Sequence, residues 1–308
     1  MNNPNPSTKL ASLKNTFPNF LVIGAMKCAT TTLFEDLNLS PNIFLAPKEL
    51  GLLKSRSVVS EPGSTDYASY FAAAKLGQVC GDISTEYSKS PDYPDVADHA
   101  YQVLGEKTKI IYMVREPVAR LLSHHQHMMN ARGAERMGND INTEIGTRPE
   151  LINYSRYAMQ LEPWLKTFGR ENIHLIVFEE YIRNRVQIID KVLDFLDVPR
   201  IDLQCKADGA NRGESRRVAN EFWAAIITSR FYRTGLRGML PVSVRQIFAK
   251  TFLKPAAQRR IPASRETLAK IIEQLAPDCE QLHKVLGTAP LWDWGTIRKK
   301  YLSNPITE

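Results

Sequence analysis

The sequence predicts an α/β fold in which helices cover both faces of a central parallel sheet. Three continuous apolar runs suit buried parallel strands, at residues 20–24, 109–114 and 173–178. Apolar residues at helical spacing follow the first two runs. Strands that alternate with helices form right-handed βαβ units, so we expect these runs to lie in one sheet.

The first part of the chain predicts an arm, two strands and a helix. Residues 1–18 are polar and rich in Pro and Asn, which predicts a flexible arm before a folded domain at 19–308. After the first strand, Leu33, Phe34 and Leu37 mark a helix. A short fourth strand is expected at 79–81, and residues 54–65 are expected to form an exposed loop.

Two helices are expected in the middle of the chain. Pro117 suits the first turn of a helix, whose apolar face carries Val118, Leu121, Leu122, His125 and Met129. A later helix buries the stripe Tyr157, Leu161, Trp164, Leu165 and Phe168. Between them, residues 130–150 are expected to form a second exposed loop, of the kind that binds ligands at the carboxyl ends of strands.

Composition excludes several classes of protein. The chain has 308 residues, of which 43% are hydrophobic and 24% charged, and this excludes disordered, collagen-like and coiled-coil proteins. No apolar run approaches the roughly 18 residues of a membrane span. The four cysteines form no CxxC pair and the N-terminus resembles no signal peptide, so we expect a cytoplasmic protein with reduced thiols.

Positive charge is concentrated in one part of the chain. The net charge is +7, and residues 206–270 contain 14 Lys and Arg against 4 Asp and Glu. This basic, helical C-terminal portion predicts an anionic partner: a nucleotide, an acidic glycan, a membrane surface or a nucleic acid. A solvated helical face is an equal alternative. Within it, residues 230–260 suit a packed amphipathic helix, with a lid or a peripheral membrane contact as alternatives.

The segment GAMKCATTTL, residues 24–33, combines small residues, one lysine and three threonines between a strand and a helix. Amides at a helix N-terminus attract anions, so this segment predicts a phosphate site. It lacks the GxxxxGK[ST] pattern of ATP-binding loops and the GxGxxG pattern. A plain Thr-capped helix is the alternative.

The second strand ends in a segment with two further polar candidates. Arg115 follows this strand, and Ser123 lies eight residues later, two turns into the predicted helix. Both can converge on one anion, and an arginine can bind a phosphate with two N–H groups. The alternative is that Arg115 pairs with Glu116.

These two segments resemble the sulfotransferase family. KCATTT resembles the 5′-phosphosulfate loop, and VREPVARLLS resembles the 3′-phosphate motif RxPxxRxxS. The resemblance covers about residues 19–295 in ordered motifs, ending with Leu268, Leu275, Leu282 and Trp294 of the C-terminal helix and tail. The resemblance implies a P-loop-like three-layer sandwich. It also implies that the co-substrate is 3′-phosphoadenosine 5′-phosphosulfate (PAPS) and that no metal is needed.

The resemblance also implies which residues bind the co-substrate. Ala29 stands where the family usually has glycine, which would lower affinity unless φ there is negative. The implied contacts are Lys27, Cys28, Ala29, Thr30, Thr31, Thr32, Arg115 and Ser123, with Arg212, Gly213, Arg216 and Arg217 in a basic closing loop.

On the acceptor side, Pro47-Lys48-Glu49 resembles the carbohydrate branch of the family. The resemblance implies that Glu49 is the general base, while Lys27 stabilises the leaving oxygen. An exposed Lys48–Glu49 ion pair is the alternative. Residues 81–87 resemble the branch's Glu-Lys-Thr-Pro-x-Tyr segment, but Ile83 replaces its lysine, so a heparan-like acceptor is not implied. Expected acceptor contacts are Lys48, Asp82, Tyr87 and His127.

The predicted function is therefore transfer of a sulfuryl group to a hydroxyl or amine of a glycan, glycoconjugate or small metabolite. His124 and His127 have the i,i+3 spacing of metal ligands, but no third ligand lies near in sequence, and no metal is expected. An ATP-dependent kinase of related fold and a non-enzymatic anion- or nucleic-acid-binding protein are the alternatives. The kinase would give Arg115 and Ser123 no 3′-phosphate to bind, and the non-enzymatic protein leaves the combination of Lys27, Glu49 and Arg115 unexplained. Oligomeric state is left open.

Overall fold

The computed structural model describes residues 17–132, 140–201, 217–219, 253–255 and 262–303. The chain divides into two compact units, Met1–Lys206 with Ile261–Glu308, and Ala207–Arg260. In the second unit, β6 (Arg217–Ala219) pairs antiparallel with β7 (Leu253–Pro255). The other residues of 207–260, and with them the predicted helix, lid or membrane contact, lie outside the described residues.

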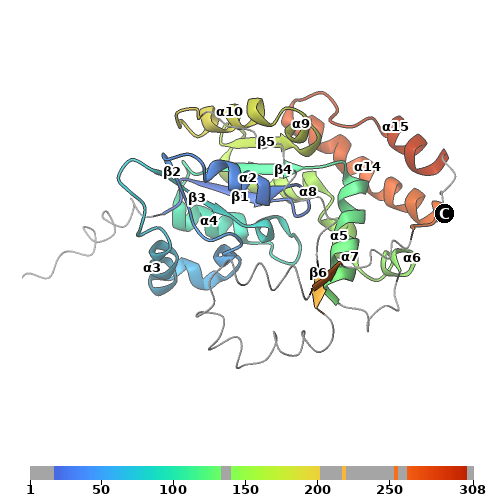
Figure 1. Cartoon of the computed structure of the whole chain (residues 1–308), viewed down its shortest axis with the longest axis horizontal. Helices are drawn as coiled ribbons and strands as arrows, with labels where there is room; N and C mark the ends of the chain where they lie inside the picture. The colour runs from blue at the N-terminus through green and yellow to red at the C-terminus, as the bar shows by residue number, and fades with distance from the viewer. Residues whose placement is uncertain (1–16, 133–139, 202–216, 220–252, 256–261, 304–308) are drawn as a thin grey trace, which may run out of the picture. The chain divides into compact units, whose positions relative to one another are not determined.

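One parallel sheet of five strands forms the centre of the first unit, in the order β2-β3-β1-β4-β5 (Figure 1). Its apolar strands β1 and β4 are central and almost entirely buried, as continuous apolar runs require. This confirms the predicted α/β fold with a parallel sheet. The strands are β1 (Phe20–Gly24), β2 (Ile43–Leu45), β3 (Val79–Ile83), β4 (Lys109–Val114) and β5 (Ile173–Val177).

Helices cover both faces of this sheet. The crossover through α2 runs toward β2, whereas those through α4 and α8 run toward β5, so right-handed connections place α2 opposite α4 and α8. In agreement, α8 packs against α4 and α14. The main helices are α2 (Thr30–Leu37), α3 (Glu61–Ser69), α4 (Val96–Leu104), α5 (Pro117–Arg132), α8 (Tyr157–Phe168), α10 (Arg185–Phe195) and α14 (Arg265–Leu286); shorter ones are α6 (Ile141–Glu144), α7 (Pro149–Asn153), α9 (Phe178–Arg183) and α15 (Trp294–Arg298).

A buried carboxylate fixes α2, the helix that follows the predicted phosphate loop. Asp36 is 2% exposed, and its Oδ2 accepts hydrogen bonds from the hydroxyl of Tyr181 (2.5 Å) and from Nε of Arg185 (2.8 Å). Its Oδ1 accepts a third from Nη2 of Arg185 at 2.5 Å. Because both oxygens are bonded, the buried charge is compensated, and α2 is held against α9 and α10.

Helix α8 is capped from another part of the chain. Its N-cap residue, Arg156, makes no side-chain cap. Instead, the carboxylate of Asp278 in α14 accepts hydrogen bonds from the amides of Ala158 and Met159, both at 2.9 Å. A carboxylate at these otherwise unpaired amides also suits the helix dipole. The C-terminal helix therefore stabilises the start of α8.

Several predicted boundaries and loops were wrong. Strand β5 ends at Val177, and Phe178 begins α9. The loop expected at 54–65 contains a 3-10 helix and the start of α3, and residues 130–150 include α6, where Glu144 is completely buried. Residues 1–16 of the expected arm lie outside the described residues, and the ring of Phe17 packs on Tyr67 with centroids 6.2 Å apart. Strand β2 was not predicted, because three residues give no usable periodicity.

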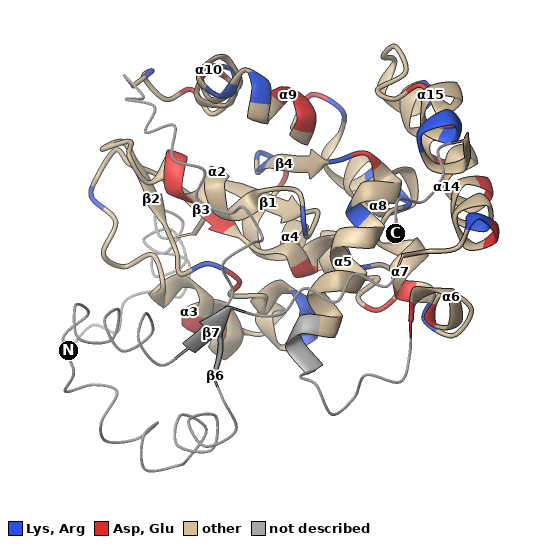
Figure 2. Cartoon of the chain, turned by 45° about the vertical axis from the view of Figure 1, so that its right-hand side comes forward, with Lys and Arg blue, Asp and Glu red and all other residues tan. Residues whose placement is uncertain are grey.

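Charge on the described helices is mixed. Lys and Arg alternate with Asp and Glu over α9, α10 and α14 (Figure 2). Within the described ranges, no helix is long and apolar enough to cross a membrane. The predicted C-terminal core residues Leu268, Leu275, Leu282 and Trp294 are buried. Cys28, Cys80 and Cys279 are free thiols, and Cys205 lies outside the described residues.

Candidate active site

The predicted phosphate loop connects β1 to α2 at the carboxyl end of the sheet. Gly24 enters it with φ 144°, and a Cβ there would lie 2.1 Å from Oγ of Ser88, so only glycine fits. Lys27 and Ala29 then adopt left-handed conformations, with φ of 71° and 67°. Ala29 is the N-cap of α2 and offers no side-chain acceptor. The start of the helix is thus suited to an external anion.

Ala29 does not have the negative φ that would have made its methyl group harmless. At φ 67° an L-residue is strained by about 1 kcal/mol or more relative to glycine. Alanine in place of the family's usual glycine at position 29 therefore costs conformational energy in this loop.

Arg115 joins the loop to the second motif. It follows β4, and its Nη1 donates a hydrogen bond to the carbonyl oxygen of Lys27 at 3.3 Å. Its guanidinium also lies over the ring of Phe178, 4.6 Å from the centroid. Among the described residues it makes no ion pair with a carboxylate. The two predicted phosphate motifs are therefore in direct contact, with the arginine charge available to an anion.

Pairing of Arg115 with Glu116, the alternative, is excluded because other groups occupy this carboxylate. Oε1 of Glu116 accepts from the amide of Ala119 at 2.9 Å. Its Oε2 accepts from Nζ of Lys300 at 2.7 Å and from the hydroxyl of Tyr301 at 3.0 Å. The C-terminal segment thus holds Glu116 away from its neighbour.

The backbone of Arg115 is fixed by a residue whose role the sequence did not indicate. The Tyr157 hydroxyl donates to the carbonyl of Arg115 at 2.8 Å, and the Arg115 amide lies 3.3 Å from the same oxygen. Tyr157 is completely buried, and Trp292 packs on its ring. In the sequence, Tyr157 belongs to the apolar stripe predicted for this helix, and that pattern gives no sign of a polar contact.

The other predicted co-substrate contacts divide into three groups. Thr30, Thr31 and Thr32 form the first turn of α2, directly after the loop that contains Cys28. Ser123 is half-buried in α5, and its hydroxyl makes no hydrogen bond to another described residue. Arg212, Gly213 and Arg216 lie outside the described residues, and only the backbone of Arg217 is described, in β6.

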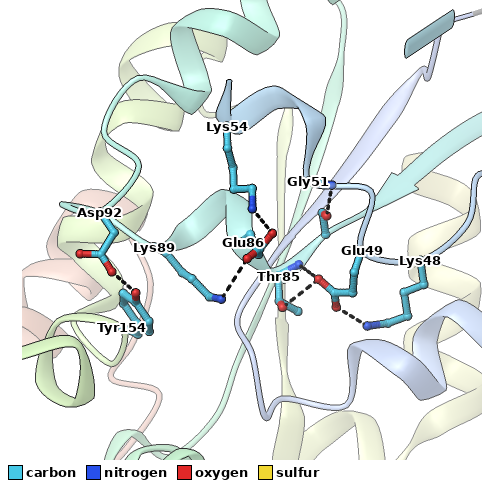
Figure 3. A network of polar contacts seen from close by, with 10 residues as sticks. Lys48, Glu49, Gly51, Lys54, Thr85, Glu86, Lys89, Asp92 and Tyr154 are labelled. Carbon is cyan, nitrogen blue, oxygen red and sulfur yellow. Dashed lines mark hydrogen bonds and ion pairs between the residues drawn. The ribbon is translucent and has the colours of Figure 1, made fainter. Parts of the chain in front are cut away.

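Glu49 follows β2 at the same edge of the sheet (Figure 3). It too is left-handed, with φ 64°, and its side chain is 36% exposed. Its Oε2 accepts from the amide and the hydroxyl of Thr85, at 2.8 and 3.0 Å. Its Oε1 pairs with Lys48. The predicted ion pair therefore exists, and Thr85 additionally orients the carboxylate.

Beside Glu49, the carboxylate of Glu86 interacts with two lysines (Figure 3). Oε2 of Glu86 pairs with Lys54, and Oε1 lies 3.8 Å from Nζ of Lys89. Nζ of Lys54 lies over the ring of Tyr93 at 4.8 Å, and Nζ of Lys89 over that of Tyr154 at 5.7 Å. Ile83, at the position of the family's lysine, is completely buried. Positive and negative groups thus alternate beside Glu49.

Asp82 and Tyr87, expected to contact the acceptor, are 0% and 2% exposed. Oδ2 of Asp82 accepts from the hydroxyls of Tyr87 (2.6 Å) and Tyr67 (2.8 Å). Burial raises the pKa of Asp82 to about 6 against the hydrogen bonds that lower it. In this arrangement the three residues brace β3, and their role toward an acceptor stays a prediction.

The histidines do not form a metal site in the described part of the chain, where no group of three His, Cys, Asp or Glu side chains could hold a metal. His124 is buried and stacks on Tyr154. Burial, aided by the charge of Arg120, lowers the pKa of His124 to about 2, so the ring is neutral. Nε2 of His125 lies 3.2 Å from the buried Glu144, and His127 is half-buried on α5.

Comparisons with known proteins agree with this geometry. A family model described as the sulfotransferase domain matches residues 18–221. Heparan sulfate glucosamine 3-O-sulfotransferase 5 of Mus musculus is 25% identical over 207 residues, 64% of this chain and 58% of that protein. The Homo sapiens protein of the same name is 25% identical over 200 residues, 62% and 56% of the two chains. This chain therefore matches less than two thirds of the length of these relatives.

A solved structure shows the same fold. The sulfotransferase from Alicyclobacillus acidocaldarius superposes with a TM-score of 0.59 and 21% identity, covering 88% of this chain and 96% of that one.

We predict that Ala29→Gly raises the free energy of unfolding by up to about 1 kcal/mol, because glycine relieves the left-handed strain. Urea denaturation measures this change. Ala276→Gly, inside α14, is the control and should lower stability by about 1 kcal/mol or more. Equal losses in the two variants would contradict the strained loop.

We also predict a pH dependence from Asp82. Its pKa is raised from 3.8 to about 6, so between these values the unfolded chain loses a proton that the folded protein keeps. Stability contributed by this group is therefore present at low pH and lost as pH rises, by about 3 kcal/mol in total. The stability of Asp82→Asn relative to the parent protein should rise by about 2 kcal/mol from pH 4 to pH 7, because at pH 4 the carboxyl of the unfolded chain is already more than half ionised. Asp66→Asn, on the exposed surface of α3, should show no such trend.

Proposed function

Since the chain belongs to the sulfotransferase family, we propose that it transfers a sulfuryl group from PAPS to an acceptor hydroxyl or amine. The observation that carries the proposal is the hydrogen bond from Nη1 of Arg115 to the carbonyl of Lys27, at 3.3 Å. This hydrogen bond connects two places where a phosphate can bind. One is the N-terminus of α2, and the other is the Arg115 guanidinium, which forms no ion pair with another described residue. A donor with 5′- and 3′-phosphates matches this pair of sites.

Charge placement suggests how the donor is held and activated. Arg115 and Ser123 bind the 3′-phosphate, the feature that distinguishes PAPS from ATP. The loop at 25–29 and the start of α2 bind the 5′-phosphate. During in-line transfer, negative charge grows on the oxygen that leaves sulfur, and Lys27 stabilises it. As in phosphoryl transfer, positioning and electrostatics supply most of the acceleration.

Glu49 removes the proton of the acceptor in this proposal. Thr85 donates two hydrogen bonds to Oε2, which fixes the direction of the carboxylate, while Oε1 faces Lys48. Since the Glu49 side chain is 36% exposed, an acceptor can approach it. The proton then passes to Glu49 as the acceptor atom bonds to sulfur.

The acceptor in the proposal is a glycan, glycoconjugate or small metabolite. The heparan acceptor named for the relatives is not carried over. At the position of the family's lysine stands the buried Ile83, and the lysines nearest Glu49 are paired with Glu49 and Glu86.

Calorimetric titration with adenosine 3′,5′-bisphosphate, the product of PAPS, tests the proposal. The parent protein should bind it more tightly than ATP–Mg²⁺. Arg115→Ala should weaken binding by about 10- to 100-fold, because a charge-assisted contact to the 3′-phosphate is lost. Glu49→Gln is the matched control: it should keep the affinity, because the Glu49 side chain contacts Lys48 and Thr85 and not the phosphate loop.

Two results would count against this function. Tight ATP–Mg²⁺ binding beside weak bisphosphate binding would favour a kinase. Bisphosphate affinity unchanged by Arg115→Ala would remove the assigned 3′-phosphate site.

A further inference from the structure

Arg120 is a buried cation in the helix that follows Arg115. It lies in α5, five residues after Arg115, and its side chain is completely buried. Its Nε donates to Oγ of Ser155 at 2.6 Å, and its Nη2 donates to the carbonyl of Leu151 at 2.9 Å. The buried Nη1 has no partner among the described residues.

The partners of Arg120 are neutral, although a buried charge normally requires an opposite one. Placing a guanidinium in a protein interior costs several kcal/mol unless a carboxylate or other anion compensates it. Among the described residues Arg120 forms no ion pair, and its two acceptors are a hydroxyl and a backbone carbonyl. Elsewhere in this unit, the buried Asp36 shows the usual solution, a paired arginine.

The ionisable neighbours of Arg120 do not supply a negative charge either. The thiol of Cys28 lies within the phosphate loop, and burial raises its pKa to about 12. Burial likewise raises the pKa of the phenols of Tyr112 and Tyr157 well above the usual value. These groups remain protonated at neutral pH, so no described residue compensates the positive charge of Arg120.

Arg120 is connected to the segment after Arg115 through Ser155, whose hydroxyl accepts from Nε of Arg120 and donates to the carbonyl of Pro117 at 3.1 Å. Tyr157, whose hydroxyl holds the carbonyl of Arg115 at 2.8 Å, is one of the groups on which the charge of Arg120 acts. Cys28, which lies between Lys27 and Ala29, is another. The positive charge of Arg120 therefore acts on a residue within the loop and on the tyrosine that holds Arg115.

We infer that Arg120 is a buried binding determinant whose counter-charge is the donor nucleotide itself. The inference rests on the proposed function, because it needs an anion with several charges at the loop. Arg120 contacts no phosphate; it raises the positive potential where Lys27 and Arg115 make the direct contacts. In the described part of the chain this buried charge has no counter-charge, and binding of the nucleotide supplies one.

The inference predicts opposite effects on stability and on binding. Arg120→Met removes the charge and keeps much of the volume, so the ligand-free unfolding temperature should stay equal or rise. Affinity for adenosine 3′,5′-bisphosphate should fall roughly 10-fold or more, because water screens a buried unit charge little and its attraction for the bound anion is then lost. Arg120→Lys keeps the charge and should retain most of the affinity.

Thermal unfolding and calorimetry of the full chain with adenosine 3′,5′-bisphosphate measure both effects. Arg170→Met is the control: this arginine donates to the carbonyl of Ile173 at the start of β5, the opposite edge of the sheet, and its loss should leave affinity unchanged. If Arg120→Met does not fold, Arg120→Gln replaces it in the comparison with Arg120→Lys.

A purely structural role would give a different pattern. Loss of ligand-free stability with parental affinity in the neutral variant would overturn the inference, and so would failure of all three Arg120 variants to fold. Failure of the proposed function is distinguishable, because the parent protein itself would then not bind the bisphosphate.

Discussion

The hydrogen bond from the Arg115 guanidinium to the Lys27 carbonyl depends on the order of strands in the sheet. Because β1 and β4 are neighbours and parallel, the residues that follow them emerge at one edge. Lys27 and Arg115, 88 residues apart, meet there. Arg115 can bind an anion only while neighbouring carboxylates bind other groups. For Glu116, these other groups are Lys300 and Tyr301. An anion site thus requires the C-terminal segment as well as the loop.

Most of the strained backbone conformations lie at the carboxyl edge of the sheet, where Lys27 and Arg115 meet. Of the four described non-glycine residues with positive φ, three are Lys27, Ala29 and Glu49, and the fourth, Asp197, lies elsewhere. Such conformations cost on the order of 1 kcal/mol or more each and persist where surrounding contacts fix them. Here α2 is anchored through Asp36, and Glu49 through Thr85. The packed elements therefore hold the two predicted reactive side chains in positions that the free chain would not favour.

Apolar runs and two ordered motifs were enough to predict the parallel sheet, α2, α5 and α8, and the family. The order of the strands was not predictable from the sequence. The Thr85–Glu49 contact was therefore not predictable either, because it requires β2 to lie beside β3. Asp82 illustrates a second limit: its resemblance to an acceptor motif says nothing of its burial, which depends on Tyr67 from α3. The cap of α8 by Asp278 spans 120 residues and leaves no local signal. The positive φ of Ala29 is imposed by its neighbours and not by its type.

The most direct test of the account is an experimental structure of the protein with adenosine 3′,5′-bisphosphate. The account predicts the 3′-phosphate within hydrogen-bonding distance of Arg115 and Ser123, and the 5′-phosphate on the amides of residues 25–30. A nucleotide bound in the reverse orientation, or away from Arg115, would contradict it.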